Sequence, residues 1–321
     1  MIRSEKISLI ITSYNQKDLL VETLESALGQ TFSPHEIIVA DDCSTDGSVE
    51  MISVYARRYP SLVNPLFQER NRGVSINRSD GFQRATGDYI TWANGDDRLL
   101  PRKLEMEIKT LRDHPGAKWV YSQVLYIDGS GERTGVVRYR GRFRKRPYTF
   151  KDVVCQIGRE PAYQLMDRSV LEQVGLFDGT LEVFEDWDFA IRLAKNFRGT
   201  YCPIPLYEYR QHRGGLCSTE KTAHVRAVKR IFHNVLPLLK GMPEKEVNQI
   251  LKTLRSEILS LKAASALETG QRWKAMAYTL RALKERPTQL FFYQMAMRSL
   301  LPGTVLDTLR IFKNRHLANL R

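Results

Sequence analysis

Short runs rich in β-branched residues alternate with helical patterns over the first 125 residues of the chain. Residues 7–12, 36–41, 62–68 and 88–93 read as strands, and apolar residues recur at helical spacing between them. Strands that alternate with helices form a mostly parallel sheet with helices on both faces. The sequence therefore predicts an α/β fold with a mostly parallel central sheet flanked by helices.

Polar clusters follow three of these predicted strands. They come directly after Ile11, Ala40 and Ala93. In parallel α/β sheets, ligands bind at the carboxyl ends of the strands. We therefore expect the three clusters to meet in one site.

The positive charge of the chain is concentrated in its last third. The net charge is +13, yet residues 1–217 hold 30 Lys and Arg against 29 Asp and Glu, whereas residues 218–321 hold 19 against 7. We predict two domains with this boundary, the second a basic α-helical C-terminal region. Such asymmetry indicates a negatively charged partner, either anionic lipid or nucleic acid, or alternatively a solvated helical face.

Cysteine spacing and hydropathy argue against several classes of protein. The four cysteines are far apart and include no CxxC pair, which argues against a zinc site or a disulfide framework and fits reduced thiols in a cytoplasm. The first apolar run is too short for a signal peptide, and no run of 18 apolar residues occurs. We expect a cytoplasmic protein without a membrane-spanning helix.

Two basic segments each have two interpretations. Residues 138–146 hold six basic residues in nine, typical of a solvated loop or of a mobile loop over a phosphorylated ligand. Residues 290–312 interleave apolar and basic residues, which suits a helix in a membrane interface or one packed on the first domain. Between these segments, residues 247–261 form one helical stripe, and residues 266–287 resemble a helix pair broken at Gly270.

Six motifs in order resemble glycosyltransferase family 2, the GT-A-fold enzymes that transfer sugars from nucleotide donors. The resemblance covers residues 5–218, and it implies a GT-A catalytic domain over residues 1–217 and an inverting reaction of the bacterial surface-glycan type. The motifs are ISLIITSYN, EIIVADDCSTDGS, Asn71-Arg72-Gly73, GFQRATGDYITWANGDDRLLP, VGLFDGTLEVFEDWDFAIRLA and YEYRQHRGGLCS.

The first half of these motifs supplies the predicted nucleotide-binding residues. Tyr14 can contact a base ring and Thr12 its edge, while Asp42 can accept a hydrogen bond from a uracil or a ribose. Alternatively, the adjacent Asp41 and Asp42 only cap the turn that follows them. The resemblance implies a nucleotide site made of Thr12, Tyr14, Asn15, Asp41, Asp42, Arg78, Asn94 and Gly95.

Asp96 and His212 are the predicted metal ligands. The family pattern is often Asp-x-Asp, and by resemblance its second Asp, here Asp96, meets a divalent metal, Mn²⁺ or Mg²⁺. The first acid of the pattern is replaced by Asn94, which puts binding of the metal by two carboxylates in doubt. A simple Asn-Gly turn after the strand is the structural alternative.

Asp186 is the predicted catalytic base, with Glu185 and Asp188 as supporting acids. By resemblance, Asp186 deprotonates the acceptor hydroxyl, and a single displacement inverts the anomeric carbon without an enzyme nucleophile. Alternatively, the three acids only stabilise the positive end of a helix dipole.

These features predict a glycosyltransferase that moves a sugar from a nucleotide-diphosphate donor, UDP being the family default, to a hydroxyl of a glycan or polyprenyl-linked glycan acceptor. It would build a surface polysaccharide such as lipopolysaccharide, as a cytoplasmic protein peripheral at the inner face of the plasma membrane. A non-catalytic nucleotide-sugar-binding or scaffold protein on the same fold is the alternative. A nucleotidyltransferase is disfavoured because residues 13–16 hold no glycine, and nucleic acid is disfavoured because no reader motif is recognisable.

Overall fold

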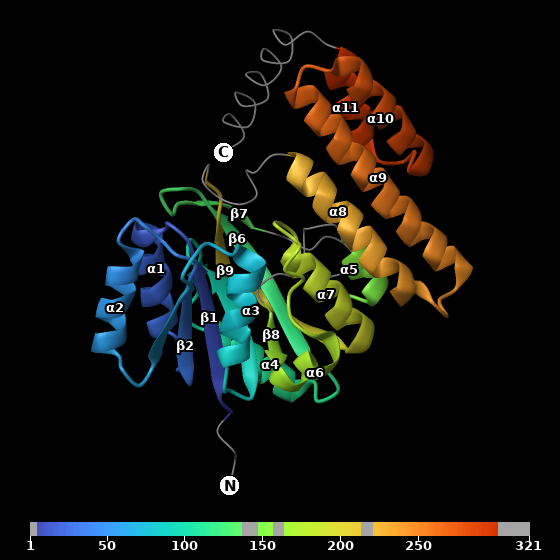
Figure 1. The fold of residues 1–321 in the computed structure, drawn as a ribbon. Helices are drawn as coiled ribbons and strands as arrows, with labels where there is room; N and C mark the ends of the chain where they lie inside the picture. The colour runs from blue at the N-terminus through green and yellow to red at the C-terminus, as the bar shows by residue number, and fades with distance from the viewer. Residues whose placement is uncertain (1–4, 137–146, 157–163, 213–220, 301–321) are drawn as a thin grey trace. The chain divides into compact units, whose positions relative to one another are not determined.

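The computed structural model describes residues 5–136, 147–156, 164–212 and 221–300 (Figure 1). The chain divides into two compact units, Met1–Ser218 and Thr219–Arg321. The strands are β1 (Ile7–Ser13), β2 (Glu36–Asp41), β3 (Val63–Phe67), β4 (Tyr89–Asn94), β5 (Arg98–Leu99), β6 (Trp119–Ile127), β7 (Arg133–Val136), β8 (Leu165–Asp167) and β9 (Gly199–Arg210). The helices are α1 (Lys17–Leu28), α2 (Ser48–Arg58), α3 (Val74–Arg84), α4 (Lys103–Asp113), α5 (Phe150–Gln156), α6 (Leu171–Val174), α7 (Glu185–Asn196), α8 (Lys221–Val235), α9 (Glu244–Glu268), α10 (Arg272–Glu285) and α11 (Leu290–Leu300), with short 3-10 turns at Arg168–Val170 and Leu236–Leu239.

All described strands belong to one sheet, with β3, β2, β1, β4, β8, β6, β9 and β5 in that order and β7 paired to β6. The four strands from β3 to β4 are mutually parallel. Beyond them, β8 runs antiparallel to both β4 and β6, and β6 pairs in parallel with β9. The predicted α/β fold is confirmed, and its parallel half contains the four strands that the sequence indicated.

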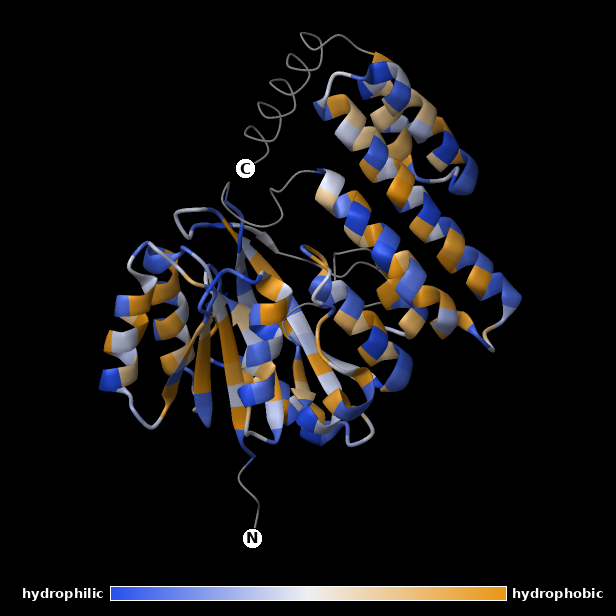
Figure 2. Cartoon of the chain, viewed as in Figure 1, coloured by the Kyte–Doolittle hydropathy of each residue, from blue (hydrophilic) through white to orange (hydrophobic). Residues whose placement is uncertain are grey.

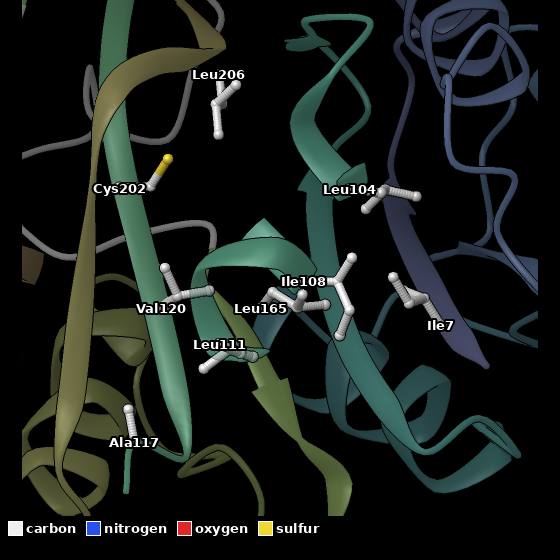
Figure 3. Packing of buried hydrophobic residues seen from close by; sticks show 9 residues of the cluster. All are labelled: Ile7, Leu104, Ile108, Leu111, Ala117, Val120, Leu165, Cys202 and Leu206. Carbon is white, nitrogen blue, oxygen red and sulfur yellow. The ribbon is translucent and has the colours of Figure 1, made fainter. Parts of the chain in front are cut away.

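Helices cover both faces of the sheet (Figure 1). Every residue of β1 is buried, as expected for a strand covered on both sides. On one face α3 approaches β1 so closely that a Cβ added at Gly81 would lie 2.7 Å from Cγ2 of Ile10. On the other face α4 packs Leu104, Ile108 and Leu111 against the strands (Figure 3). Their spacing places them on one helical stripe.

The register of β1 brings three strand ends together. Thr12 pairs with Ala40 of β2 on one side and with Asn94 of β4 on the other, and Ser13 pairs with Asp41. Because these strands run parallel, their carboxyl ends share one edge of the sheet. The predicted convergence of the three polar clusters is therefore observed.

The second unit is helical in its described part, residues 221–300. The predicted stripe over residues 247–261 lies on α9, whose Ile250 and Leu254 are fully buried. The predicted break at Gly270 is the turn between α9 and α10, where φ is +71°, a conformation that favours glycine. No described helix is long and apolar enough to cross a membrane. The basic run 138–146 and the end of the apolar–basic segment, residues 301–312, lie outside the described residues.

Candidate active site

The ends of β1, β2 and β4 are joined by short backbone hydrogen bonds. The amide of Gly95 donates to the carbonyl of Thr12 at 2.8 Å, and the amide of Asp42 donates to the carbonyl of Ser13 at 2.9 Å. A Cβ added at Gly95 would lie 3.0 Å from Oε1 of Gln16 and 3.1 Å from the Thr12 carbonyl oxygen. A side chain here would thus force the two strand ends apart.

The two adjacent acids after β2 have different partners. Both carboxylate oxygens of Asp41 accept from Ser44, from its amide at 2.8 Å and from its hydroxyl at 2.6 Å. Burial raises the pKa of Asp41. Asp42 instead accepts from the amides of Arg72 and Gly73, each at 2.8 Å. Asp41 therefore caps its own turn, as the structural alternative supposed, whereas Asp42 ties this edge to the loop before α3.

The loop after β1 is held by Asn15. Its amide donates to the Ser44 hydroxyl at 2.8 Å, and its side-chain oxygen accepts from the Thr45 amide at 2.8 Å. Asn15 has a φ of +50°, which asparagine tolerates better than most residues. The neighbouring Tyr14 is 47% exposed. The loop therefore presents an aromatic ring to solvent at the edge of the site.

Asp96 and His212 lie side by side although they are 116 residues apart in the chain. Nε2 of His212 is 2.8 Å from Oδ2 of Asp96, and both side chains are partly exposed. Arg210 supports the pair, because its Nε donates to the Asp96 carbonyl at 2.7 Å. The structure thus brings together the two predicted metal ligands.

The chemistry of this pair fits a divalent cation that binds both carboxylate and imidazole. Mn²⁺ suits that mixture, whereas Mg²⁺ favours oxygen ligands. Within the described residues, no group of three or more His, Cys, Asp and Glu side chains could hold a metal ion. Asp96 and His212 would hold such a cation, which would supply Lewis-acid chemistry at the phosphates of a bound nucleotide.

Asp97, next to the predicted metal ligand, is fully buried beneath the site. It accepts from the Arg210 amide and the Tyr207 hydroxyl, both at 2.8 Å, and from Nδ2 of Asn94 at 3.0 Å. Burial raises the pKa of Asp97 well above its ordinary value, and Asp96 adds to the shift. Sequence reasoning missed this role, although Tyr207 and Arg210 stand in the last recognised motif.

Arg78 connects the loop after β4 to α7. Its Nη2 donates to Oδ1 of Asn94 at 2.8 Å, and its Nη1 donates to Oε1 of Glu185 at 2.6 Å. The guanidinium lies against the rings of Trp92 and Phe177, with its carbon 5.9 Å and 5.3 Å from their centroids. Arg78 is almost fully buried. The pairing of Arg78 with Glu185, 107 residues away, was not predicted from the sequence.

The acids of the FEDWD motif form the first turn of α7. Phe184, just before them, has a left-handed backbone with φ +64°, which is strained for a bulky residue. Asp188 pairs with Arg192 at 2.9 Å and so braces its own helix. Asp186 is half-buried, and burial raises its pKa while the charge of Arg78 opposes the shift. Burial likewise raises the pKa of Glu185.

Comparison with known protein families assigns the chain to one of them. The model of the family described as "Glycosyl transferase family 2" matches residues 8–175, just over half of the chain. The chain belongs to glycosyltransferase family 2. The match ends before Glu185, so the sites on α7 and β9 lie beyond it.

Several family relatives come from bacteria. The uncharacterized glycosyltransferase YwdF of Bacillus subtilis is 30% identical over 206 residues, which cover 64% of this chain and 74% of that protein. The putative teichuronic acid biosynthesis glycosyltransferase TuaG of the same organism is 31% identical over 107 residues, 33% of this chain and 42% of that one. The chain spans 37% of the uncharacterized Mycobacterium tuberculosis protein Rv1520 and 46% of the B. subtilis putative glycosyltransferase EpsE.

Solved structures of glycosyltransferases share the fold. TarS of S. aureus, residues 1–349 in complex with UDP-GlcNAc, has a TM-score of 0.65 at 18% identity, over 87% of this chain and 81% of that one. The mannosyltransferase PcManGT of Pyrobaculum calidifontis, in complex with GDP-Man and Mn²⁺, has a TM-score of 0.58 at 18% identity, over 93% and 88%. At this identity the likeness shows the fold alone, and it confirms the predicted GT-A type.

Proposed function

We propose that this family 2 protein is an inverting glycosyltransferase. It transfers a sugar from a nucleotide-diphosphate donor, with UDP as the expected nucleotide, to a hydroxyl of a glycan or polyprenyl-linked glycan during surface-polysaccharide synthesis. One observation carries the proposal: Arg78 links Asn94 at the end of β4, two residues before the Asp96–His212 pair, to Glu185 at the start of α7. A donor-binding edge and a candidate base thus belong to one connected site.

The nucleotide would bind along the ends of β1, β2 and β4. Tyr14 would stack on the base, Thr12 and Asp42 would hydrogen-bond to the base or ribose, and Asn15 would hold the loop. Asp41 would act behind Asp42, through its turn. The UDP-GlcNAc and GDP-Man complexes of structural neighbours support a nucleotide-sugar donor on this fold.

Asp96 and His212 would hold the divalent metal. Such a cation stabilises the negative charge that develops on the leaving nucleoside diphosphate. The Mn²⁺ in the mannosyltransferase complex supports this assignment. The protein's own part is to aim the two side chains, through the hydrogen bond from Arg210 to the Asp96 backbone.

Asp186 would take the proton from the acceptor hydroxyl as its oxygen bonds to the anomeric carbon and the bond to the diphosphate breaks. A raised pKa suits this role, because a base works best when its pKa approaches the working pH. Glu185 is less suited to act as the base, because its carboxylate is paired with Arg78. Its role is to hold the guanidinium and, through it, the geometry of the site.

The alternative of a non-catalytic binding protein rests on Asn94, which stands where the family often has an acid. The surroundings of Asn94 favour an amide. Its Nδ2 donates to the buried Asp97 while its Oδ1 accepts from Arg78. A carboxylate at this position would lose that donor and face Asp97 at hydrogen-bond distance. Asn94 therefore fits an intact site, and we favour the catalytic function.

The acceptor and the place of action extend the proposal. A polyprenyl-linked acceptor would put the reaction at the inner face of the plasma membrane, in the cytoplasm, with the basic helical unit against the lipid. The biosynthetic role in the name of TuaG supports a surface-polysaccharide product. The net positive charge of residues 218–321 supports the membrane contact.

The test is transfer and donor hydrolysis against a panel of nucleotide sugars with Mn²⁺. We expect one donor to be consumed, and Asp186→Asn to lower kcat by about 10²–10⁴. Asp96→Ala should also abolish turnover, whereas Glu182→Gln, an exposed acid in the same segment, should leave it unchanged. If donors raise the melting temperature but none is turned over, even with lipid-linked acceptors, the protein is a binding module.

A further inference from the structure

The helices α10 and α11 expose several large apolar side chains. On α10 the buried residues are small, namely Ala275, Thr279 and Ala282. The large apolar residues Trp273 and Leu280 point outward, and Trp273 is 82% exposed. A helix of a globular protein normally turns its apolar stripe towards the core. On α10, Trp273 and Leu280 lie away from the core, whereas Tyr278 packs against it.

Helix α11 buries large apolar residues on one face and exposes others on the opposite face. Phe292, Met295 and Ser299 are buried against the rest of the helical unit. The opposite face carries a second stripe at helical spacing, and Leu290 in this stripe is 69% exposed. When a helix is apolar on two faces, one face packs on the core and the other is expected to contact a second apolar partner. The exposed stripe consists of Leu290, Tyr293, Met297 and Leu300.

Charge around these residues has one sign. Residues 272–300 hold six Lys and Arg and a single acid, Glu285. Four of the basic residues are exposed: Lys274, Arg281, Lys284 and Arg298. Figure 2 shows hydrophilic and hydrophobic residues interleaved along these helices. The combination of exposed apolar and basic side chains suits a binding partner with an apolar interior and a negatively charged surface.

We propose that this α10–α11 surface, defined by Trp273, Leu280, the α11 stripe and the four exposed basic residues, binds the face of an anionic phospholipid bilayer. The apolar side chains enter the headgroup–acyl boundary, and the basic residues pair with lipid phosphates. Trp and Tyr favour this boundary because each has an apolar ring and a polar end.

Two other occupants fit the charges or the apolar residues less well. A second copy of the chain would place like-charged surfaces against each other in a symmetric dimer. A nucleic acid would satisfy the basic residues but leave the leucines and Met297 without an apolar partner. The bilayer satisfies both groups at once. This proposal rests on the membrane contact of the proposed function and deepens it by assigning that contact to named residues.

The chain carries its own probe for this binding. Of its four tryptophans, Trp92, Trp119 and Trp187 are buried, and Trp273 is exposed. Fluorescence of the full-length protein is measured with vesicles of phosphatidylcholine alone or with phosphatidylglycerol, without any sugar donor. With anionic vesicles we expect a blue shift, protection from acrylamide and quenching by brominated lipid. Trp273→Phe should keep binding in a flotation assay and lose these signals.

Variants then separate the apolar and basic contributions. Leu290→Ser with Met297→Ser should abolish flotation, whereas Leu236→Ser, an exposed leucine of the same unit outside α10 and α11, should not. Lys284→Gln should weaken binding about fivefold, because each basic residue near an anionic surface contributes about that factor. Equal flotation with neutral vesicles, protection of Trp273 by self-association or by RNA alone, or no binding would each overturn the proposal. Since no turnover is measured, the outcome is independent of catalysis.

Discussion

The two units of the chain put polar and apolar groups in opposite places. In the first unit charged groups lie in the interior, where Asp97, Arg78 and Glu185 are almost fully buried at the carboxyl edge of the sheet. In the second unit the buried residues of α10 are small, and Trp273 and Leu280 face outward. Buried charge costs stability unless it is paired, and exposed apolar surface costs solubility. The first unit thus loses stability, and the second loses solubility, at the surface where each is expected to bind a ligand.

The largest effect on stability should come from breaking a buried ion pair of the first unit that lies outside the candidate site. Lys103 and Glu107 pair at 2.5 Å in α4, and both are fully buried. Glu107→Gln leaves the lysine charge unpaired, so we expect the free energy of unfolding to fall by about 3–5 kcal/mol in urea denaturation. The double replacement Lys103→Met with Glu107→Leu should restore most of the loss.

A matched control for that variant lies in the same helix. Lys109 and Asp113 have the same spacing, but both are largely exposed. Asp113→Asn should leave the urea midpoint unchanged, because solvent screens such a pair. Equal losses in the two variants would show that burial does not set the cost of charge in this unit.

A smaller effect is expected from restoring the family acid. Asn94→Asp removes a donor from the buried carboxylate of Asp97, and such hydrogen bonds to charged groups contribute about 1.5–3 kcal/mol. We therefore expect the free energy of unfolding to fall by about that amount and, because Asp97 adjoins the proposed metal ligand Asp96, kcat/KM to fall as well. Adding Asp97→Asn restores one donor and one acceptor across this contact and should recover part of the activity. An increase in the single variant would mean that Asn94 is a lost acid after all.

The pH profile should report the candidate base. Burial raises the pKa of Asp186, and a base must be ionised to act, so activity should fall with decreasing pH at a pKa above the ordinary value of about 4. Arg78 lowers this pKa, so Arg78→Met should move the acid limb of kcat/KM to higher pH as well as reduce its height. A limb that stays in place would assign it to another group.

The smallest effect should be found on the outside of the helical unit. Phe291 is exposed and its neighbour Phe292 is buried. Phe291→Ala should change the free energy of unfolding by no more than about 0.5 kcal/mol, the usual range for surface positions. Phe292→Ala should lower it several-fold more, because it leaves a cavity. If both variants were equally destabilised, the outer surface would be part of a core.

The parallel half of the sheet was predictable, because fully buried strands leave a continuous apolar run in the sequence. The predicted strand at residues 36–41 matches β2, and the one predicted at residues 88–93 differs from β4 by one residue at each end. The three-residue β8 and two-residue β5 were not, since such short strands have no periodicity. They exist because longer neighbours hold them in the sheet.

In the candidate site, the residue types were readable and their pairing was not. Glu185 stood in one motif and Arg78 between two others, and nothing local indicates that one guanidinium bridges Asn94 and α7. The role of Asp97 was not predicted for a similar reason, because two of its three donors named above come from β9, 110 residues or more downstream. The roles of Asp41 and Asp42 diverge only through their neighbours. The motifs indicate which residue types carry the chemistry, and tertiary contacts decide which role each of them has.

The position of β9 at the far end of the first unit's sequence has a consequence for biosynthesis. A ribosome makes β1, β2 and β4 first, and the partners of Asp96 and Asp97 emerge more than a hundred residues later. Until then, the nucleotide edge lacks His212 and the support of Arg210. A nascent or prematurely ended chain that contains all four parallel strands therefore still lacks the Asp96–His212 pair, so the proposed metal site is complete only once nearly the whole first unit has been made.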